Sequence, residues 1–263
     1  MSEPIAPTEP AADVVARLRA AGCVFAEEEA ELLTAAAAGP AELDAMVERR
    51  AAGLPLEHVV GWAEFAGLRI EVDGGVFVPR RRTEFLAAEA VARARPGAVC
   101  VDLCCGSGAA AAVLLASIAD VEVHAADIEP AAVRCARRNV EPRGGRVYEG
   151  DLFAPLPNAL RGRIEVLVAN VPYVPSGEVA LLPAEAREHE PLVALDGGAD
   201  GLEVLRRVAA GAAEWLAPGG HLLFETSERQ TGAAVAAVAA HGLTARILTD
   251  EDLYATVVVA TRA

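Results

Sequence analysis

The chain has 263 residues, of which 53% are hydrophobic and 23% charged, as in a folded globular protein. These proportions exclude a disordered chain and a fibrous repeat, and the length excludes a disulfide-stapled miniprotein. Lys and Arg number 23 against 38 Asp and Glu, and the resulting net charge of -15 disfavours nucleic acid as a direct partner.

Several features of the sequence indicate the cellular compartment in which the protein is expected. Residues 1–10 are acidic and proline-rich, without the cationic start and apolar core of a secretory signal. The richest apolar run, residues 109–119, is shorter than the ~20 residues that a membrane-spanning helix needs. The five cysteines are an odd number, which suits reduced thiols. We therefore expect a cytoplasmic protein with no membrane partner and no disulfide framework.

The first part of the chain has helical periodicity. Apolar residues in 11–52 recur at spacings of three and four, which predicts three short helices separated by Gly22, Gly39 and Gly53. No nucleotide-binding pattern lies there, so we interpret residues 1–60 as a small helical accessory domain. In residues 62–79, apolar residues around Gly67 and the turn at 73–75 predict short strands, and we expect a β-hairpin connector over 61–82.

From residue 83 onward, strands alternate with helices, the pattern of a doubly wound sheet. Strands are predicted over 99–103, 122–126, 146–148, 166–169, 221–225, 244–248 and 256–261. Helices are predicted over 83–94, 109–117, 130–139, 201–216 and 229–240, with a long loop over 172–200. No crossover fits between the last two strands, so we expect them to be antiparallel. The predicted class is α/β, with a Rossmann-like domain over 83–263 built on a seven-stranded mixed sheet.

The predicted strand 99–103 runs into a glycine-containing turn and then a helix, the arrangement by which a backbone approaches a nucleotide. This turn contains Cys104, Cys105, Gly106 and Gly108. Asp127 ends the next strand, 19 residues after Gly108, where its carboxylate can accept hydrogen bonds from both ribose hydroxyls. The alternative role for Asp127 is an ordinary cap of the following helix.

The composition of this turn limits the ligand. Cys104 stands where a dinucleotide-binding turn begins with glycine, and no glycine-rich continuation for a pyrophosphate follows. A third acid, Asp151, follows the third strand and can accept a hydrogen bond from an adenine amino group. We therefore expect a ligand without phosphates, and S-adenosylmethionine fits, since its ribose and adenine suit acidic partners and its sulfonium is cationic. Cys100, Cys104 and Cys105 lack the paired spacing of metal ligands, so we expect packed thiols and no metal site.

The tetrapeptide Asn170-Val171-Pro172-Tyr173 directly follows an apolar strand, at the edge where open α/β sheets bind ligands. The Asn170 side-chain oxygen and the Val171 carbonyl can each accept one hydrogen from a planar amide, while Tyr173 packs against it. Such contacts would position a poor nitrogen nucleophile in line with a methyl carbon. The alternative is that Asn170 and Pro172 only shape a turn.

These motifs resemble those of the HemK-like protein glutamine-N5 methyltransferases, which modify the Gln of the Gly-Gly-Gln loop in peptide chain release factors. The resemblance spans nearly the whole chain and includes residues 64–68, 77–80, 83–84, 102–108, 127, 151, 170–173 and 190–198. It implies a class I methyltransferase that uses S-adenosylmethionine, with a release factor or another protein as partner. All cofactor-type motifs begin at or after Phe77, so we expect residues 1–60 and the arginines at 80–82 to recognise that substrate.

The resemblance also implies roles for individual residues. Catalysis would involve Asn170, Val171, Pro172 and Tyr173, and the substrate would contact Arg80, Asn170, Pro172 and Tyr173. The implied cofactor contacts are Phe77, Asp102, Cys104, Cys105, Gly106, Gly108, Asp127, Ile128, Asp151, Leu152 and Asn170.

Three positions depart from the family pattern. Val171 replaces the first Pro of Asn-Pro-Pro-Tyr but keeps a backbone carbonyl, and Arg81 and Arg82 replace a Pro and an acid. These departures leave a second hypothesis open, a divergent N-methyltransferase that acts on another protein or a small metabolite. The complete set of motif residues argues against a non-catalytic sensor of S-adenosylmethionine, and the net charge argues against a nucleic-acid methyltransferase.

Overall fold

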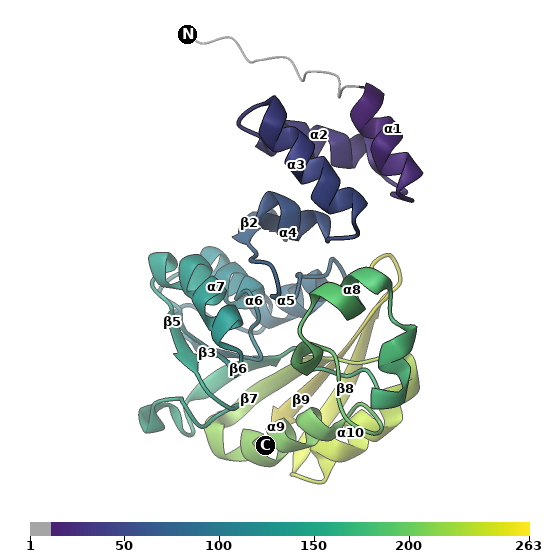
Figure 1. The fold of residues 1–263 in the computed structure, drawn as a ribbon. Helices are drawn as coiled ribbons and strands as arrows, with labels where there is room; N and C mark the ends of the chain where they lie inside the picture. Colours follow the sequence, from purple (N-terminus) through teal and green to yellow (C-terminus); the bar gives the residue numbers. More distant parts are fainter. Residues whose placement is uncertain (1–11) are drawn as a thin grey trace.

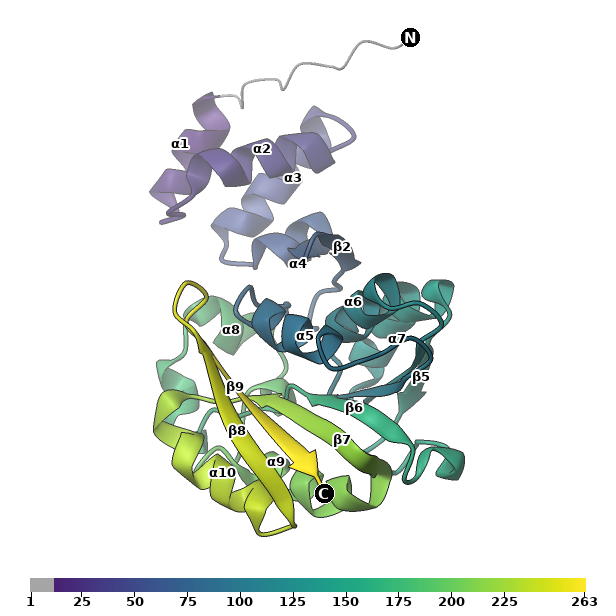
Figure 2. The same cartoon turned by 180° about the vertical axis from the view of Figure 1, so that it is seen from behind.

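The computed structural model describes residues 12–263, so the acidic residues 1–10 lie outside the described part. Helices α1 (Ala12–Ala20), α2 (Ala26–Ala36), α3 (Pro40–Ala51) and α4 (Leu56–Val60) form a helical segment over residues 12–60, which stands at one end of the molecule in Figures 1 and 2. Buried apolar side chains from all four helices form a core cluster of their own. The three predicted helices are confirmed, and α4 is additional.

A two-stranded hairpin joins the helical segment to the rest of the chain. Strands β1 (Trp62–Phe65) and β2 (Leu68–Glu71) pair antiparallel, as predicted. Ala66 and Gly67, with φ of 49° and 75°, form the tight turn. The prediction of strand structure beyond residue 72 is wrong: Val76 and Val78 lie in irregular backbone, where burial in an apolar cluster and not strand pairing accounts for their hydrophobicity.

The main sheet contains seven strands in the order β5-β4-β3-β6-β7-β9-β8. Their bounds are β3 (Val99–Leu103), β4 (Glu122–Asp127), β5 (Arg146–Glu149), β6 (Ile164–Ala169), β7 (Leu216–Glu225), β8 (Leu243–Asp250) and β9 (Ala255–Arg262). β9 is antiparallel to both β7 and β8, and the other neighbours are parallel. The predicted seven-stranded mixed sheet is therefore confirmed.

Helices cover both faces of this sheet. One face carries α5 (Thr83–Val91), α6 (Ala109–Ser117) and α7 (Pro130–Val140), and the other carries α9 (Glu203–Trp215) and α10 (Thr231–Ala239). Side chains of β3 alternate between the two cores: Val101 packs toward α9, and Cys100 packs toward α5 and α6. Because β3 is buried on both faces, its sequence is a continuous apolar run except for Asp102.

The segment predicted as a long loop over 172–200 contains a short helix, α8 (Ala184–His189), and 3₁₀ turns. A six-residue helix is too short to display helical periodicity, and prolines flank it at 183 and 191. This segment lies over the carboxyl edge of the sheet (Figure 1).

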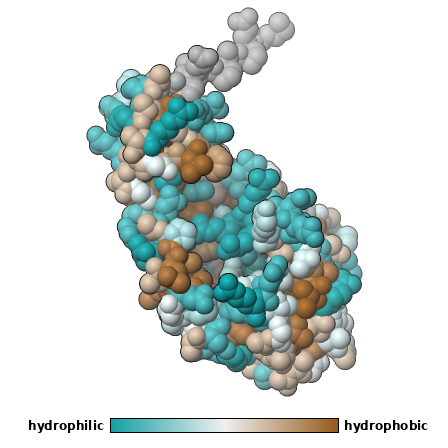
Figure 3. Space-filling view, turned by 90° about the vertical axis from the view of Figure 1, so that its right-hand side faces the viewer, coloured by the Kyte–Doolittle hydropathy of each residue, from teal (hydrophilic) through white to brown (hydrophobic). Residues whose placement is uncertain are grey.

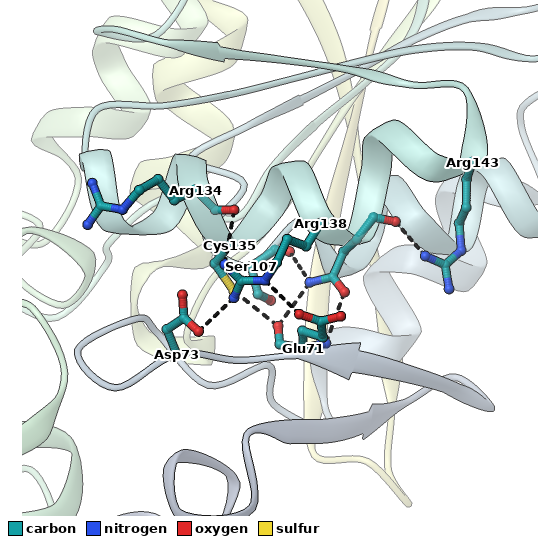
Figure 4. A network of polar contacts seen from close by, with 8 residues as sticks. Glu71, Asp73, Ser107, Arg134, Cys135, Arg138 and Arg143 are labelled. Atoms are coloured by element: carbon teal, nitrogen blue, oxygen red, sulfur yellow. Dashed lines mark hydrogen bonds and ion pairs between the residues drawn. The ribbon is translucent and has the colours of Figure 1, made fainter.

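The hairpin is bound tightly to α7 and to the turn after β3 (Figure 4). The Asn139 amide is 2% exposed; it accepts from the Glu71 backbone N–H at 2.9 Å and donates to the Glu71 carbonyl at 2.9 Å and the Ser107 carbonyl at 2.8 Å. Arg138 forms ion pairs of 2.6 Å with Glu71 and with Asp73. These contacts fix the hairpin relative to the sheet.

The surface is mixed in character. On the face shown in Figure 3, hydrophobic residues gather in separate patches between hydrophilic ones. In the part of the chain that the structure describes, no helix is long and apolar enough to cross a membrane.

Candidate functional site

A cavity of about 390 Å³ opens at the carboxyl ends of β3, β4 and β6. The chain leaves β3 toward β4 on one side and returns to β6 on the other, so this is the switch point at which open α/β sheets bind ligands. Fourteen of the predicted residues line the cavity: Phe77, Arg80, Asp102, Cys104, Cys105, Gly106, Asp127, Ile128, Asp151, Leu152, Asn170, Val171, Pro172 and Tyr173.

Gly108 is the predicted residue that does not line the cavity. It has a φ of 78°, and a Cβ there would come within 2.7 Å of Val140 Cγ2 on α7. Gly106, with a φ of 55°, differs because a Cβ there would meet nothing within 4 Å. The two glycines of the turn therefore have different roles. Gly108 lets the turn pack closely against α7, and Gly106 leaves open space next to its backbone at the cavity wall.

Asp127 contacts the turn and the helix that follows it. Its Oδ2 accepts from the Gly106 N–H at 2.8 Å, and its Oδ1 accepts from the Glu129 N–H at 2.9 Å. Glu129 is the N-cap residue of α7, so Asp127 bonds the amide just before the helix and not the second or third helical amide that an ordinary cap bonds. Burial raises the pKa of its carboxyl. Each oxygen keeps a second lone pair for a ligand in the cavity.

Asp102 is the most buried acid of the site, with 2% of its surface exposed. Its Oδ2 accepts from the Ala111 N–H at 3.1 Å, which holds the first turn of α6. Burial raises the pKa of Asp102 to about 7, and the neighbouring Asp127 adds to this increase. Asp102 therefore changes charge near neutral pH.

Asp151 forms an ion pair with Arg207 of α9, a partner that the sequence did not indicate. Both residues line the cavity. The Arg207 guanidinium stands close enough to orient the Asp151 carboxylate, which leaves its second oxygen for a ligand.

The cysteines at the cavity are not arranged for chemistry of their own. Burial raises the pKa of Cys104 and Cys105, so both thiols stay protonated at neutral pH. Among the described residues no group of three His, Cys, Asp or Glu side chains is placed to hold a metal ion. Cys104 has a φ of 54°, a conformation that favours glycine, which is the residue expected there in a dinucleotide-binding turn.

The tetrapeptide at 170–173 follows β6 and faces the same cavity. Val171 is 2% exposed and belongs to the core beneath the sheet edge, which anchors the segment. The Tyr173 carbonyl accepts from Gln230 Nε2 at 2.9 Å, and Val174 pairs with the loop at Leu195 and Gly197. Asn170 and Tyr173 thus project from a firmly held backbone.

Two arginines at the cavity are already paired. Arg80, a predicted substrate contact, donates from Nη2 to both Glu190 oxygens at 2.6 Å and lies 4.8 Å from the centre of the Phe77 ring. Arg82 donates to Glu225 at 2.9 Å. Arg81 does not line the cavity. Glu190 belongs to the stretch 190–198 that carries the resemblance, but its contact with Arg80 was not predicted, and Glu225 was not singled out at all. The two arginine partners lie 110 and 143 positions away along the chain.

The cavity fits S-adenosylmethionine. The open space beside Gly106 and the Asp127 carboxylate suit a ribose, and Asp151 suits a polar adenine edge. Ile128 is 49% exposed at the cavity, which leaves an apolar surface for a ring to cover. The acids match a cationic ligand and repel a phosphorylated one.

Comparisons with known proteins agree with this geometry. Residues 69–185 match the family described as the methyltransferase small domain. A methyltransferase from Pyrococcus furiosus has the same fold, with a TM-score of 0.56 and 16% identity over 75% of this chain and 90% of that one. Among curated proteins, the 4-amino-L-phenylalanine/4-methylamino-L-phenylalanine methyltransferase of Streptomyces pristinaespiralis is 38% identical over 74% of this chain and 69% of its own length.

Several of the similar curated proteins are release factor glutamine methyltransferases. That of Mycolicibacterium smegmatis is 37% identical over 90% of this chain and 90% of its own length. That of Geobacter sulfurreducens is 40% identical over 71% of this chain and 66% of its own length, just under two thirds. The chain belongs to the family of release factor glutamine methyltransferases, and its cofactor is S-adenosylmethionine.

Proposed function

We propose that the protein methylates the side-chain amide nitrogen of a glutamine, in the Gly-Gly-Gln loop of a peptide chain release factor. The observation that carries the proposal is that one cavity is lined by the turn after β3, by Asp127 at the end of β4 and by Asn170 to Tyr173. A site for the methyl donor and a site for a planar amide are thereby adjacent.

S-adenosylmethionine supplies a methyl group bonded to a sulfonium, which is reactive toward a nitrogen lone pair. We assign the ribose to Asp127, the adenine edge to Asp151, and apolar contacts to Phe77, Ile128 and Leu152, all of which line the cavity.

The residues after β6 act on the acceptor. An amide nitrogen is a poor nucleophile because its lone pair is delocalised. The Asn170 oxygen and the Val171 carbonyl each accept one amide hydrogen, which orients the nitrogen, and the Tyr173 ring packs against the amide plane. Orientation of this kind supplies much of the rate enhancement of a bimolecular transfer. Pro172 keeps Val171 extended, so that its carbonyl faces the acceptor.

We assign substrate recognition beyond the glutamine to the helical segment, residues 12–60. Within the described part of the chain, none of its side chains lines the cavity. It does present apolar side chains to solvent: Val24 is 83% exposed and Phe25 65%. A protein partner needs roughly 20 to 30 residues a side, far more than a cavity mouth offers.

The test is mass spectrometry of a purified release factor after incubation with the protein and S-adenosylmethionine. We expect one added methyl group on the glutamine of the Gly-Gly-Gln loop, and none with the Asn170→Ala variant, which should still bind the cofactor. A release factor in which this glutamine is replaced by alanine is the control substrate. A release factor that stays unmodified would refute the proposal.

A second candidate is N-methylation of a small aromatic amine. It is favoured by the 38% identity to the aminophenylalanine methyltransferase and by the departures at Arg81, Arg82 and Val171. Incubation with 4-amino-L-phenylalanine under the same conditions distinguishes the two. Methylation of the amino acid together with an unmodified release factor would favour this candidate over the first.

A further inference from the structure

Glu225 is a buried carboxylate with no role in the chemistry described so far. It ends β7, is 3% exposed, and does not itself line the cavity. Burial of an ionised carboxylate costs several kcal/mol unless donors surround it. A carboxylate at the end of this buried strand therefore needs hydrogen-bond donors around it.

Three side chains supply those partners. Thr83 Oγ1 donates to Glu225 Oε2 at 2.6 Å, and Arg82 Nε donates to Oε1 at 2.9 Å. The Tyr173 hydroxyl donates to the same Oε1 at 3.4 Å. Although Glu225 lies behind the cavity wall, all three donors line the cavity. One carboxylate thus reaches two segments of that wall, the start of α5 and the residues after β6.

The arrangement restrains the Tyr173 side chain from two directions. The Arg82 guanidinium lies 5.9 Å from the centre of the Tyr173 ring, and Glu225 receives the hydroxyl. Burial and the nearby Glu225 charge raise the pKa of Tyr173 to about 12, so the hydroxyl remains a donor to the carboxylate. Without Glu225, Arg82 would lose its anionic partner and the ring its hydroxyl contact.

We propose that Glu225 is a positioning residue for methyl transfer, which sets the orientation of the Tyr173 ring and of the Arg82 guanidinium at the acceptor end of the cavity. This inference rests on the proposed function, because it assigns Tyr173 to the acceptor amide. Glu225 touches neither the acceptor nor the cofactor, and it acts through Tyr173.

A purely structural role for Glu225, the attachment of α5 to β7, predicts a different outcome. Loss of that attachment lowers stability and disturbs the cavity as a whole, cofactor site included. Loss of positioning lowers kcat with release factor while leaving the affinity for S-adenosylmethionine unchanged.

The experiment uses the full chain with Glu225→Gln, which keeps the shape of the side chain and removes its charge. We expect kcat to fall about 10- to 100-fold, the order seen for a misplaced reacting group, with cofactor affinity by calorimetry unchanged. In a Tyr173→Phe background, the same substitution should cost much less, because coupled residues are not additive. Glu165→Gln, which removes a partly exposed carboxylate on β6, is the matched control. An unchanged kcat, or losses that combine additively, would overturn the proposal.

A readout without turnover separates this inference from the proposed function. The chain has 3 tyrosines, so the ring signals of a ¹³C-tyrosine sample can be assigned with Tyr173→Phe. We expect the Tyr173 signal to shift in Glu225→Gln and to stay in place in Glu165→Gln. If the wild type leaves release factor unmodified, the proposed function fails while this measurement still decides whether Glu225 orients the ring. A Tyr173 signal that does not respond to Glu225→Gln refutes the positioning role.

Discussion

The acids of the cavity hold backbone amides in addition to facing the ligand space. Asp127 binds the N–H groups of Gly106 and Glu129, and Asp102 binds that of Ala111. Their substitution therefore affects both the ligand and the local backbone, and the two effects have to be measured separately.

For Asp127, removal of the carboxylate should weaken cofactor binding. We expect Asp127→Ala to lose roughly 1 to 3 kcal/mol of binding free energy for S-adenosylmethionine, since polar groups of the ligand and two backbone amides lose their acceptor. Calorimetry measures the affinity, and circular dichroism checks that the variant is folded. An unchanged affinity would remove Asp127 from the cofactor site.

Asp102 should make stability depend on pH. Its pKa is about 7 in the folded protein, whereas an unfolded aspartate has a pKa of about 3.9. Between these values the folded state binds more protons, so its stability falls as pH rises and levels off above the folded pKa. Relative to Asp102→Asn, the wild type should lose up to roughly 1.4 kcal/mol of unfolding free energy per pH unit in this window. Urea unfolding across the window measures this, and parallel curves for the two proteins would contradict it.

At the scale of elements, the two glycines of the turn after β3 give opposite predictions. Gly108→Ala should lower the unfolding free energy by more than about 1 kcal/mol, because a left-handed φ is strained and the new Cβ meets Val140 on α7. Gly106→Ala carries the conformational cost alone, but it adds a methyl group to a residue that lines the cavity. We expect Gly108→Ala to be the less stable variant in urea unfolding and Gly106→Ala to be the weaker binder in calorimetry. If Gly106→Ala were the less stable variant and Gly108→Ala the weaker binder, the assignment of Gly108 to helix packing and of Gly106 to the cavity would be wrong.

Elements with a strong local signal were predictable from the sequence. The bounds of β3 and α6 match the predicted residues 99–103 and 109–117, because a continuous buried run and a glycine turn define both. Helix α8 was missed because it is short and flanked by prolines. Glu225 was missed for another reason: its bond to Thr83 spans 142 positions, and only the folded sheet brings the two together.

At the scale of the molecule, a chain of charges joins the helical segment to the cavity. Arg50 of α3 pairs with Glu29 of α2 at 2.6 Å and with Glu185 of α8 at 2.5 Å, and its side chain is 10% exposed. Glu185 also lines the cavity. The helical segment therefore contacts a residue of the cavity wall through the Arg50 guanidinium.

If the helical segment recognises the substrate, the Arg50–Glu185 ion pair helps to hold that segment in a fixed orientation relative to the cavity. We expect Glu185→Gln to lower kcat/KM for intact release factor, by a few-fold since Glu185 is partly exposed, with little change in cofactor affinity. Glu214→Gln, which breaks an exposed ion pair to Arg161 outside both the helical segment and the cavity lining, is the control. Steady-state kinetics with both variants measures the effect; equal kcat/KM values for Glu185→Gln and wild type would contradict it.

The Asn139 amide has a consequence for local opening of the protein. One buried amide bonds both Glu71 of the hairpin and Ser107 of the turn after β3, so separation of either segment from α7 leaves that amide with an unsatisfied polar group. Opening of the two segments is thereby coupled. Any ligand that binds only the closed turn must then also disfavour opening of the hairpin, by mass action. Within residues 62–71 only Phe65 lines the cavity, yet the amide hydrogens of the whole hairpin should exchange more slowly when S-adenosylmethionine is bound.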